Sequence, residues 1–529
     1  MDADTGRATD GAGGWGGSDV ATGLEQSVDG PARDASTLPD EPGPGSRRRW
    51  WDRHTALIAA GGGLLGALLF LVAYRGMPDD SYITLDYARN VVEYGHWGLT
   101  PFRDANSATS PLNVWLLVGG ILVSGRPAVA VGLVLIATTA VTAVWAAQLG
   151  RSVGVRPALV AGLTVGLLVT SPIFAAVVGM ESFLVAATLI GVARYAADRR
   201  AVAAGIVTGL AVLTRPDLAL PAVVLVAVLF LAQAPREWRR ALLAVGVGVL
   251  VTLPWHVWSW FVLGSFVPDS LIIKTSGAFP GGEVFGNGPL FMAMRWPIAM
   301  LVVGVVAGVG VVSAVASAVR WVRGADRLLD RVVVAAGLAA AAHYAAYAAM
   351  GVSSYIWYYC PSLALLTLCA AVGAADLRAR VTGAVVTGLA LVAGIGVGHQ
   401  AGLGLPWPHP TIFGNWASAA DYINAGTELG RTLPPGQSVL APGEIGTLAF
   451  GCRCDIVDQF SDRARLMSIV DSRLATAGPV EGFLLRLNFL HAQRLPVEPP
   501  DRQLTYETGP GPGWPTYVIG RGPGHLVLE

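Results

Sequence analysis

The stretch Met77-Pro78-Asp79-Asp80-Ser81-Tyr82 follows directly on the first long apolar run, Thr55 to Tyr74. Two adjacent carboxylates at the mouth of a membrane helix are costly to keep there. A carboxylate beside an apolar wall is what a general base requires, because its surroundings can tune its pKa. We therefore interpret Asp79 and Asp80 as the catalytic couplet, and the rest of the chain as the cavity that covers it.

The composition predicts an all-α polytopic membrane protein. Of the 529 residues, 53% are hydrophobic and 14% are charged, and the mean hydropathy is +0.54. Apolar stretches of about 20 residues recur along the chain, each long enough to cross roughly 30 Å of hydrocarbon. The formal net charge is +0, which argues against nucleic acid as a partner.

The arginines predict the orientation in the membrane. Residues 1–53 are rich in Gly, Asp, Ser and Pro and are expected to form a disordered tail. Arginines at 47–49 and 53 precede the first span, which places this tail in the cytoplasm. If the short apolar segment 111–124 lies in the interface, every later arginine cluster also falls inside; if it crosses, all fall outside. We therefore expect eleven spans: 55–74, 127–149, 157–178, 182–197, 201–214, 218–234, 241–264, 296–320, 332–351, 358–375 and 381–399.

The first expected external loop, 75–126, contains a helical pattern after the acidic couplet. Ile83, Tyr87, Val91 and Tyr94 recur at helical spacing, with polar residues on the opposite face. This pattern predicts an amphipathic helix lying in the membrane interface, with Asp86, Asn90 and Glu93 turned to water.

The expected domains are a transmembrane catalytic domain, 54–399, with a further external loop at 265–295, and a small outer α/β domain, 400–529. Ser418 to Arg431 predicts a helix with Ser418 as its N-cap. Residues 438–441 and 455–457 predict short strands around a turn at 443–446. Cys452 and Cys454 are too close in sequence for a good disulfide and receive no role.

When the N-terminus is cytoplasmic and the expected spans cross in turn, the unusual polar residues of the apolar region all fall on the outer face. Paired acids, an arginine, a lysine and aromatic residues beside lipid suit one reaction, the transfer of a sugar from a polyprenyl phosphate to a hydroxyl. The hydroxyl needs a carboxylate base, and the departing lipid phosphate needs cations. Tyrosine and tryptophan provide faces for sugar rings.

The candidate ligands each have a structural alternative. Arg215-Pro216-Asp217 could end a helix with an interfacial ion pair, and Glu181 could cap the next helix. Lys274, the one lysine in the sequence, could be an ordinary loop cation. No His, Cys or acidic cluster has metal-ligand spacing, and a requirement for a divalent metal stays open. The candidates for donor and phosphate binding are Tyr82, Arg215, Asp217 and Lys274, and those for substrate binding are Ser110, Glu181, Tyr358, Tyr359, Glu444, Asp458 and Arg463.

Several of these stretches together resemble a known family. They look like the GT-C glycosyltransferases that use polyprenyl-phosphate sugars, and most closely like the actinobacterial terminal β-(1→2)-arabinofuranosyltransferase family, AftB. The likeness covers most of 55–460. The matching stretches are Asp-Asp-Ser-Tyr-Ile-Thr-Leu-Asp-Tyr-Ala-Arg-Asn at 79–90, Ala-Thr-Ser-Pro-Leu at 108–112, Gly-Met-Glu-Ser at 179–182, Leu-Thr-Arg-Pro-Asp at 213–217, Ile-Ile-Lys-Thr at 272–275 and Trp-Tyr-Tyr-Cys-Pro at 357–361.

The resemblance implies a decaprenyl-phosphoryl-arabinofuranose donor and an arabinan acceptor of the cell wall, in arabinogalactan or lipoarabinomannan. It implies that Asp79 is the catalytic carboxylate with Asp80 beside it, and that Arg215 and Lys274 lie near the phosphate. It also implies glycan binding for 400–529. Whether the transfer retains or inverts the anomeric configuration stays open.

Three alternatives remain at this stage. The enzyme could use another polyprenyl-phosphate sugar, such as mannose. The protein could instead be a lipid transporter or flippase, although no internal repeat of the kind common in transporters is visible. It could also be a non-catalytic membrane subunit whose outer domain binds glycan.

Overall fold

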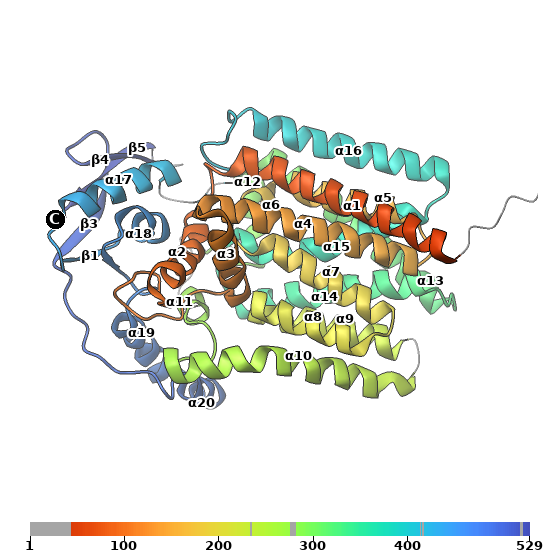
Figure 1. The fold of residues 1–529 in the computed structure, drawn as a ribbon, viewed down its shortest axis with the longest axis horizontal. Coiled ribbons are helices and arrows are strands. Elements are labelled where there is room, and N and C mark those ends of the chain that lie inside the picture. The colour runs from red at the N-terminus through yellow and green to blue at the C-terminus, as the bar shows by residue number, and fades with distance from the viewer. Residues whose placement is uncertain (1–43, 233–234, 276–281, 413, 415–416, 519–521) are drawn as a thin grey trace, which may run out of the picture. The chain divides into compact units, whose positions relative to one another are not determined.

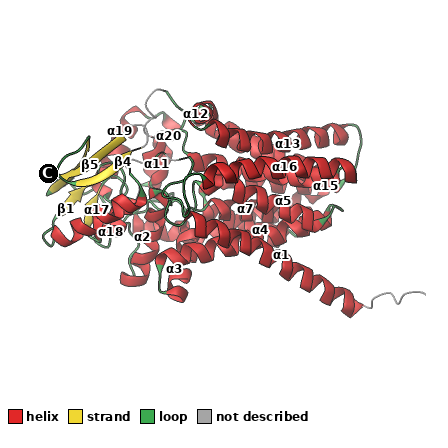
Figure 2. Ribbon diagram, turned by 90° about the horizontal axis from the view of Figure 1, so that it is seen from above, coloured by secondary structure: helices red, strands yellow, loops and turns green. Residues whose placement is uncertain are grey.

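The computed structural model describes residues 44–529 except 233–234, 276–281, 413, 415–416 and 519–521. Most of the predicted tail, 1–43, lies outside the described residues, and the first helix begins at Pro44, earlier than expected. Asp52–Glu529 form one compact unit. Within it, long helices lie side by side (Figure 1), and the strands gather at one end (Figure 2).

Seven helices among the described residues are long and apolar enough to cross a membrane. Each corresponds to one of the eleven expected spans. They are α1 (Pro44–Ala73), α4 (Pro127–Ser152), α10 (Trp238–Trp258) with its π-helical extension η4 (Ser259–Leu263), α13 (Pro297–Val322), α14 (Leu328–Met350), α15 (Cys360–Asp376) with the preceding turn η5 (Ile356–Tyr359), and α16 (Ala379–Ala401).

The four remaining expected spans are shorter apolar helices, and whether each one crosses stays a prediction. The segment 157–178 is not one continuous helix, because Ser171 precedes Pro172 and is extended, and a residue before proline disfavours the helical conformation. These four are α5 (Pro157–Thr170), α7 (Ser182–Ala197), α8 (Ala201–Thr214) and α9 (Ala219–Leu231). A fifth short apolar helix, α3 (Pro111–Ser124), is the segment expected in the interface. Further short elements are α6 (Pro172–Ala175), η2 (Pro216–Leu218), η3 (Pro235–Glu237), α11 (Ser270–Thr275) and α12 (Gly288–Arg295).

Small residues allow the helices to approach closely. Gly205 and Gly209 of α8 lie against Val247 and Val251 of α10, where a side chain at either glycine would collide. Close approach of backbones through small residues is how membrane helices gain packing energy, because lipid supplies no hydrophobic drive between them.

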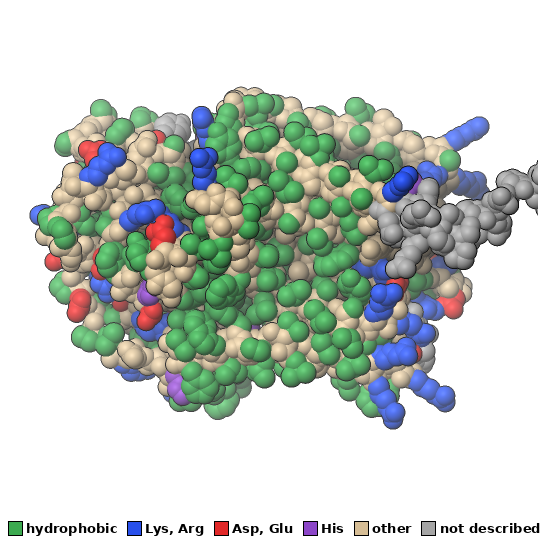
Figure 3. Space-filling view, viewed as in Figure 1, with side chains coloured by type: hydrophobic (Ala, Val, Ile, Leu, Met, Phe, Trp, Pro, Cys, Tyr) green, Lys and Arg blue, Asp and Glu red, His purple; other side chains and the backbone are tan. Residues whose placement is uncertain are grey.

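The arginine-rich loops meet at one end of the bundle. Arginine side chains gather at the end opposite the sheet (Figure 3). Arg199 pairs with Glu237 across two loops, and Arg327 pairs with Asp376 across two others. This common end is what the predicted orientation requires, while the side of the membrane on which it lies stays a prediction.

Helix α2 (Asp79–Tyr94) differs from the expected interfacial helix. Its supposed water-facing residues Asp86 and Asn90 are buried. Asp86 pairs with Arg89, which also donates to the carbonyl of Phe450, and Asn90 donates to the carbonyls of Gly98 and Leu99. Glu93, the third polar residue of this face, is exposed as expected. Arg89, the partner of Asp86, is covered by Phe450 of the C-terminal part, a contact that helical periodicity cannot reveal.

The C-terminal part is a small α/β unit, as predicted. Ser418 caps α17 by accepting a hydrogen bond from the Asp421 amide. The predicted turn at 443–446 instead leads into helix α18, so β1 and β2 are parallel strands joined by a crossover helix. The sheet order is β2-β1-β3-β5-β4. The elements are α17 (Ala419–Thr432), α18 (Gly446–Cys452), α19 (Arg463–Thr476), α20 (Pro479–Asn488), β1 (Ser438–Leu440), β2 (Asp455–Val457), β3 (Arg502–Thr508), β4 (Trp514–Val518) and β5 (Gly522–Leu528).

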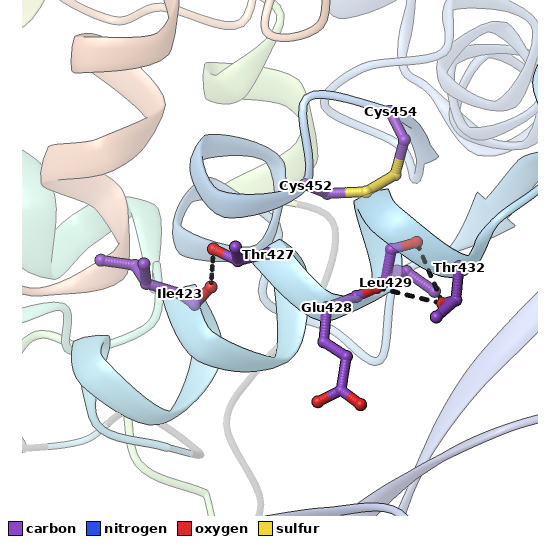
Figure 4. Close-up of a disulfide and its surroundings, with 7 residues drawn as sticks. All are labelled: Ile423, Thr427, Glu428, Leu429, Thr432, Cys452 and Cys454. Carbon is purple, nitrogen blue, oxygen red and sulfur yellow. Dashed lines mark hydrogen bonds between the residues drawn. A yellow bond between two sulfur atoms is a disulfide. The ribbon is translucent and has the colours of Figure 1, made fainter.

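Cys452 and Cys454 form a disulfide, contrary to the expectation from their spacing (Figure 4). The bridge follows the last turn of α18, where Arg453 adopts a left-handed conformation with φ of 54°. This reversal turns the chain so that both sulfur atoms lie on the same side of the turn.

Candidate active site

A cavity of about 480 Å³ lies where the end of the helical bundle meets the C-terminal unit. Its size falls in the range of small-molecule sites. The couplet at the start of α2 forms one wall, and the aromatic segment 354–357 forms another. The polar lining residues are Asp79, Asp80, Lys274, Glu283, Arg295, Ser354, Tyr355 and Glu444.

One side of this cavity adjoins exposed apolar surface. Met292, Trp296 and Ile356 line the cavity itself. Beside them, α12 and the start of α13 expose large apolar side chains. Such a surface on a membrane protein faces lipid acyl chains. The exposed residues are Leu290, Met294, Ile298 and Leu301.

Asp80 and Lys274 form the central ion pair of the cavity. The Lys274 ammonium donates to Asp80 Oδ1 over 2.6 Å. The same ammonium lies 4.6 Å from the ring centre of Trp357 and 5.1 Å from that of Tyr355, so two aromatic faces also stabilise its charge. An ammonium has three N–H donors, and one hydrogen bond to Asp80 leaves capacity for an anionic ligand.

The C-terminal unit holds Lys274 in place. Lys274 belongs to the short helix α11, whose Ile272 and Ile273 are buried against Leu466 and Met467 of α19. Arg473 of α19 also donates to the Thr275 hydroxyl over 2.6 Å. The cation therefore depends on two segments that are about 190 residues apart in the chain.

Asp79 has a different environment from Asp80. Its carboxylate accepts hydrogen bonds from the backbone amides of Ile445, Gly446 and Thr447 over 2.7–3.2 Å, and from the Thr447 hydroxyl. These donors are buried amides at the N-terminus of α18 that have no partner within the helix, a position that favours a carboxylate. Burial raises the pKa of the Asp79 carboxyl; hydrogen bonds from Thr447 oppose this rise, and the neighbouring Asp80 adds to it.

Gly446 makes this junction possible. A Cβ atom at Gly446 would collide with the carbonyl oxygen of Asp79 and with the amide of Ile83. Further contacts join the same two helices: the rings of Tyr82 and Phe450 lie 5.2 Å apart, edge to face. Asp79 is therefore the anchor that fixes the C-terminal unit over α2.

A second ion pair lines the cavity where it adjoins the exposed apolar surface. Arg295 Nη1 lies 3.0 Å from Glu283 Oε2, and the Ser354 hydroxyl donates to the other oxygen of Glu283. The Arg295 side chain is 55% exposed, whereas Glu283 is buried. Part of the guanidinium is thus accessible to a ligand in the cavity.

Arg215 lies outside this cavity, in a buried cluster of its own. Its guanidinium donates to Glu181 over 3.1 Å and to Asp217 over 3.0 Å, and it contacts the Tyr347 hydroxyl at 3.2 Å. The Tyr347 hydroxyl donates in turn to Asp217. Arg215 and Glu181 are 3% and 4% exposed, so the sequence grouping of Arg215 with Lys274 is not reproduced by the geometry.

The other predicted ligands also lie away from the cavity lining. Tyr358 packs against the Arg215 guanidinium, and Tyr359 donates to the Phe285 carbonyl. Tyr82 packs on Phe450, and Ser110 caps α3 by accepting from the Asn113 amide. Asp458 accepts from the amides of its own turn, and Arg463 pairs with Asp269. Of the predicted substrate ligands, Glu444 alone is among the lining residues of the described chain.

The cavity residues that were not predicted as ligands include Glu283, Arg295, Tyr355 and Trp357. Glu283 and Arg295 are separated by an apolar stretch and belong to no recognisable motif. Tyr355 and Trp357 precede the predicted Tyr358 and Tyr359 in the same aromatic segment. The sequence alone does not show which of these rings reaches the cavity. Among the described residues, no group of three His, Cys, Asp or Glu side chains is arranged to hold a metal ion.

Comparison with solved structures identifies the fold class. The structure is similar to the crystal structure of ArnT from Cupriavidus metallidurans in the apo state, with a TM-score of 0.57 and 17% identity over 91% of this chain and 98% of that chain. ArnT bound to undecaprenyl phosphate gives a TM-score of 0.53 and 17% identity over 89% and 97% of the two chains. No family model matches the sequence, and no curated protein matches it. The chain has the GT-C fold: a helical membrane bundle with a small C-terminal α/β unit.

Proposed function

We propose that this protein is a membrane glycosyltransferase that uses a polyprenyl-phosphate sugar as its donor. The observation that carries the proposal is the Asp80–Lys274 pair, which sits in a cavity bordered on one side by exposed apolar surface. A base and a phosphate-binding cation beside lipid are the parts that this reaction needs. The likeness in fold to ArnT, which has been crystallised with undecaprenyl phosphate, supports the same reading.

In the proposed reaction, Asp80 accepts the proton of the acceptor hydroxyl while that oxygen attacks the anomeric carbon. The bond between this carbon and the phosphate oxygen breaks, and the electron pair leaves with the polyprenyl phosphate. Lys274 and Arg295 neutralise the charge on the departing phosphate, as preorganised cations do in phosphate chemistry. One displacement of this kind inverts the anomeric configuration, so the configuration of the product tests the scheme.

Asp79 takes a positioning role in this proposal, in place of the catalytic role that the resemblance implies. Both of its oxygens already accept hydrogen bonds from α18. Asp80 is 26% exposed and has one cation as its partner. We therefore assign the proton transfer to Asp80 and the docking of the C-terminal unit to Asp79.

The sequence motifs favour D-arabinofuranose as the sugar and a cell-wall arabinan, in arabinogalactan or lipoarabinomannan, as the acceptor. A donor of decaprenyl-phosphoryl-arabinose type follows from the same motifs. Glu444 is on the C-terminal wall of the cavity, where a carboxylate can accept hydrogen bonds from acceptor hydroxyls. Another polyprenyl-phosphate sugar, such as mannose, is the alternative within the same reaction.

The proposed location is the plasma membrane, with the cavity and residues 400–529 on the outer face. The gathering of arginines at the opposite end of the bundle supports this orientation. The acceptor glycan would then reach the cavity from the outside, while the donor enters from the outer leaflet.

The proposal is tested by measuring sugar transfer with purified protein in lipid nanodiscs. Synthetic polyprenyl-phosphoryl arabinofuranose and mannose serve as donors, and a short arabinan oligosaccharide serves as the acceptor. The expected result is transfer by the wild-type protein and by the Asp104→Asn control, a carboxylate that is 70% exposed and outside the cavity, but not by Asp80→Asn. Movement of polyprenyl phosphate between leaflets without any transfer would overturn the proposal in favour of a flippase.

A further inference from the structure

Helix α20 exposes a continuous apolar row on the C-terminal unit. Val480, Phe483, Leu484 and Leu487 recur at positions i, i+3, i+4 and i+7, the spacing of one helical face. These four side chains are between 42% and 73% exposed. Leu490, just beyond the helix, is 63% exposed and extends the row. Neighbouring large apolar side chains on a water-facing surface mark a contact with a partner or a membrane.

The opposite face of α20 is fully used by the protein itself. Leu485 and Phe489 are buried against Leu466 and Val470 of α19. This packing fixes the rotation of the helix, so the exposed row cannot turn inward without breaking the cluster. The packing of α20 on α19 therefore keeps this apolar row on the surface.

The exposed row continues the surface of a membrane-spanning helix. Helix α10 and η4 form one of the seven candidate spans, and Phe261 and Val262 near its end are 58% and 59% exposed. The Trp260 indole donates to the Leu487 carbonyl over 3.0 Å. The His491 ring lies 4.6 Å from the ring of Phe261. Figures 1 and 3, drawn from the same side, show apolar side chains continuing from the end of α10 onto the region of α20.

The connection between the two helices is rigid. The Phe266 amide donates to the Asn488 carbonyl over 3.3 Å, and the Val267 amide donates to the Asn488 side chain over 2.8 Å. A membrane boundary that meets the end of α10 therefore also meets α20. Tryptophans Trp258 and Trp260 at this end fit the aromatic belt of such a boundary.

We propose that α20 is an interfacial membrane helix, whose apolar row lies in the boundary between headgroups and acyl chains. The occupant of this surface is the lipid bilayer, because the row is continuous with the lipid-facing surface of α10. Arg486 of α20 is exposed beside this row, and a cation at the edge of an interfacial apolar face can meet lipid phosphates.

One consequence rests on the proposed function. The cluster that orients α20 also contains Ile272 and Ile273 of α11, the helix that carries Lys274. Contact of α20 with the bilayer would therefore set the height of Lys274 relative to the lipid phosphates. The membrane contact itself does not depend on the identity of the reaction.

The test measures lipid contact directly. Two variants, each with one added cysteine, Phe483→Cys and Leu484→Cys, carry an environment-sensitive fluorophore at that position. They are placed in nanodiscs that contain lipids with doxyl groups near the headgroup. Gln503→Cys is the matched control, an exposed position on β3 of the same unit. The unmodified protein gives the labelling background, since Cys360 and Cys369 are buried and Cys452 and Cys454 are bridged.

We expect the doxyl lipids to quench the labels at 483 and 484 several-fold more than the label at 503. Equal, water-like exposure of all three labels would overturn the proposal and assign the row to a protein partner instead. The measurement needs no donor and no turnover. A failure of the proposed glycosyl transfer would therefore leave its result unchanged.

Discussion

The Arg215 cluster, with Glu181 and Asp217, and the Lys274 pair, with Asp80, differ in one decisive respect. Arg215 is 3% exposed and is shared between Glu181 and Asp217. Lys274 is 9% exposed, pairs among the acids of the described residues with Asp80, and lines a cavity. A buried cation with two carboxylates is a complete structural unit, whereas a cation with one partner and open space beside it can bind a ligand. A ligand site therefore differs from a structural cluster in having a cation with unused hydrogen-bond donors that a ligand can reach. A charge at membrane depth does not by itself mark a site.

The largest effect is expected from Asp80→Asn. This change removes the proposed base while keeping the volume of the side chain, so the rate of sugar transfer should fall about 10²–10⁴-fold. Kinetics with the polyprenyl-phosphate donor that the wild type uses provide the measurement, and Asp104→Asn provides the control. Transfer at the wild-type rate would show that Asp80 is not the base.

Arg215→Ala should act on stability. It leaves the buried carboxylate of Glu181 and the partly buried carboxylate of Asp217 without their common partner, which costs about 3–5 kcal/mol. Thermal unfolding in detergent measures the loss. Arg295→Ala is the matched comparison in the cavity and should cost less, because Arg295 is 55% exposed and Glu283 keeps the hydrogen bond from the Ser354 hydroxyl. Equal destabilisation by the two variants would contradict the division into scaffold and site.

Asp79→Asn should weaken the junction with α18. An amide cannot accept at both former oxygens, so one set of buried donors loses its partner at a cost of about 1–3 kcal/mol. Gly446→Ala should loosen the same junction by collision. Both variants should unfold at lower temperature and still transfer sugar while folded. Loss of transfer by Asp79→Asn at an unchanged unfolding temperature would instead return the base to Asp79, as the resemblance implies.

The last effect depends on pH and concerns Asp458, which serves as a control within the C-terminal unit. Burial raises its pKa to about 7, opposed by hydrogen bonds from the amides of Phe460 and Ser461. Because the folded pKa is above the unfolded value of 3.8, folding favours the protonated form, and stability falls as pH rises from about 4 to about 7. Asp458→Asn should remove this decline in the unfolding temperature. An identical decline in the variant would assign it to another group.

The sequence predicted the helices well and the site only in part. Apolar runs and flanking prolines determine where the helices of the bundle begin and end, and both signals are local. The roles of Asp79 and Asp80 depend on Ile445 to Thr447, more than 360 residues away in the chain, and adjacent identical side chains carry no signal that separates them. The burial of Asp86 escaped prediction for the same reason, because its partner Arg89 contacts the distant Phe450. The Cys452–Cys454 bridge escaped for another reason, because it depends on a chain reversal at Arg453 that the spacing does not show.

The most direct test of the central claim is the affinity for polyprenyl phosphate, measured on purified protein in nanodiscs with Lys274→Ala and Arg215→Lys. Loss of one charge-assisted hydrogen bond at Lys274 costs about 1.5–3 kcal/mol, which predicts an affinity roughly 10- to 100-fold weaker. Arg215→Lys keeps the charge of the buried cluster and should leave the affinity of the folded protein unchanged. Unchanged affinity in Lys274→Ala, together with a large loss in Arg215→Lys, would contradict the assignment of the cavity as the donor site.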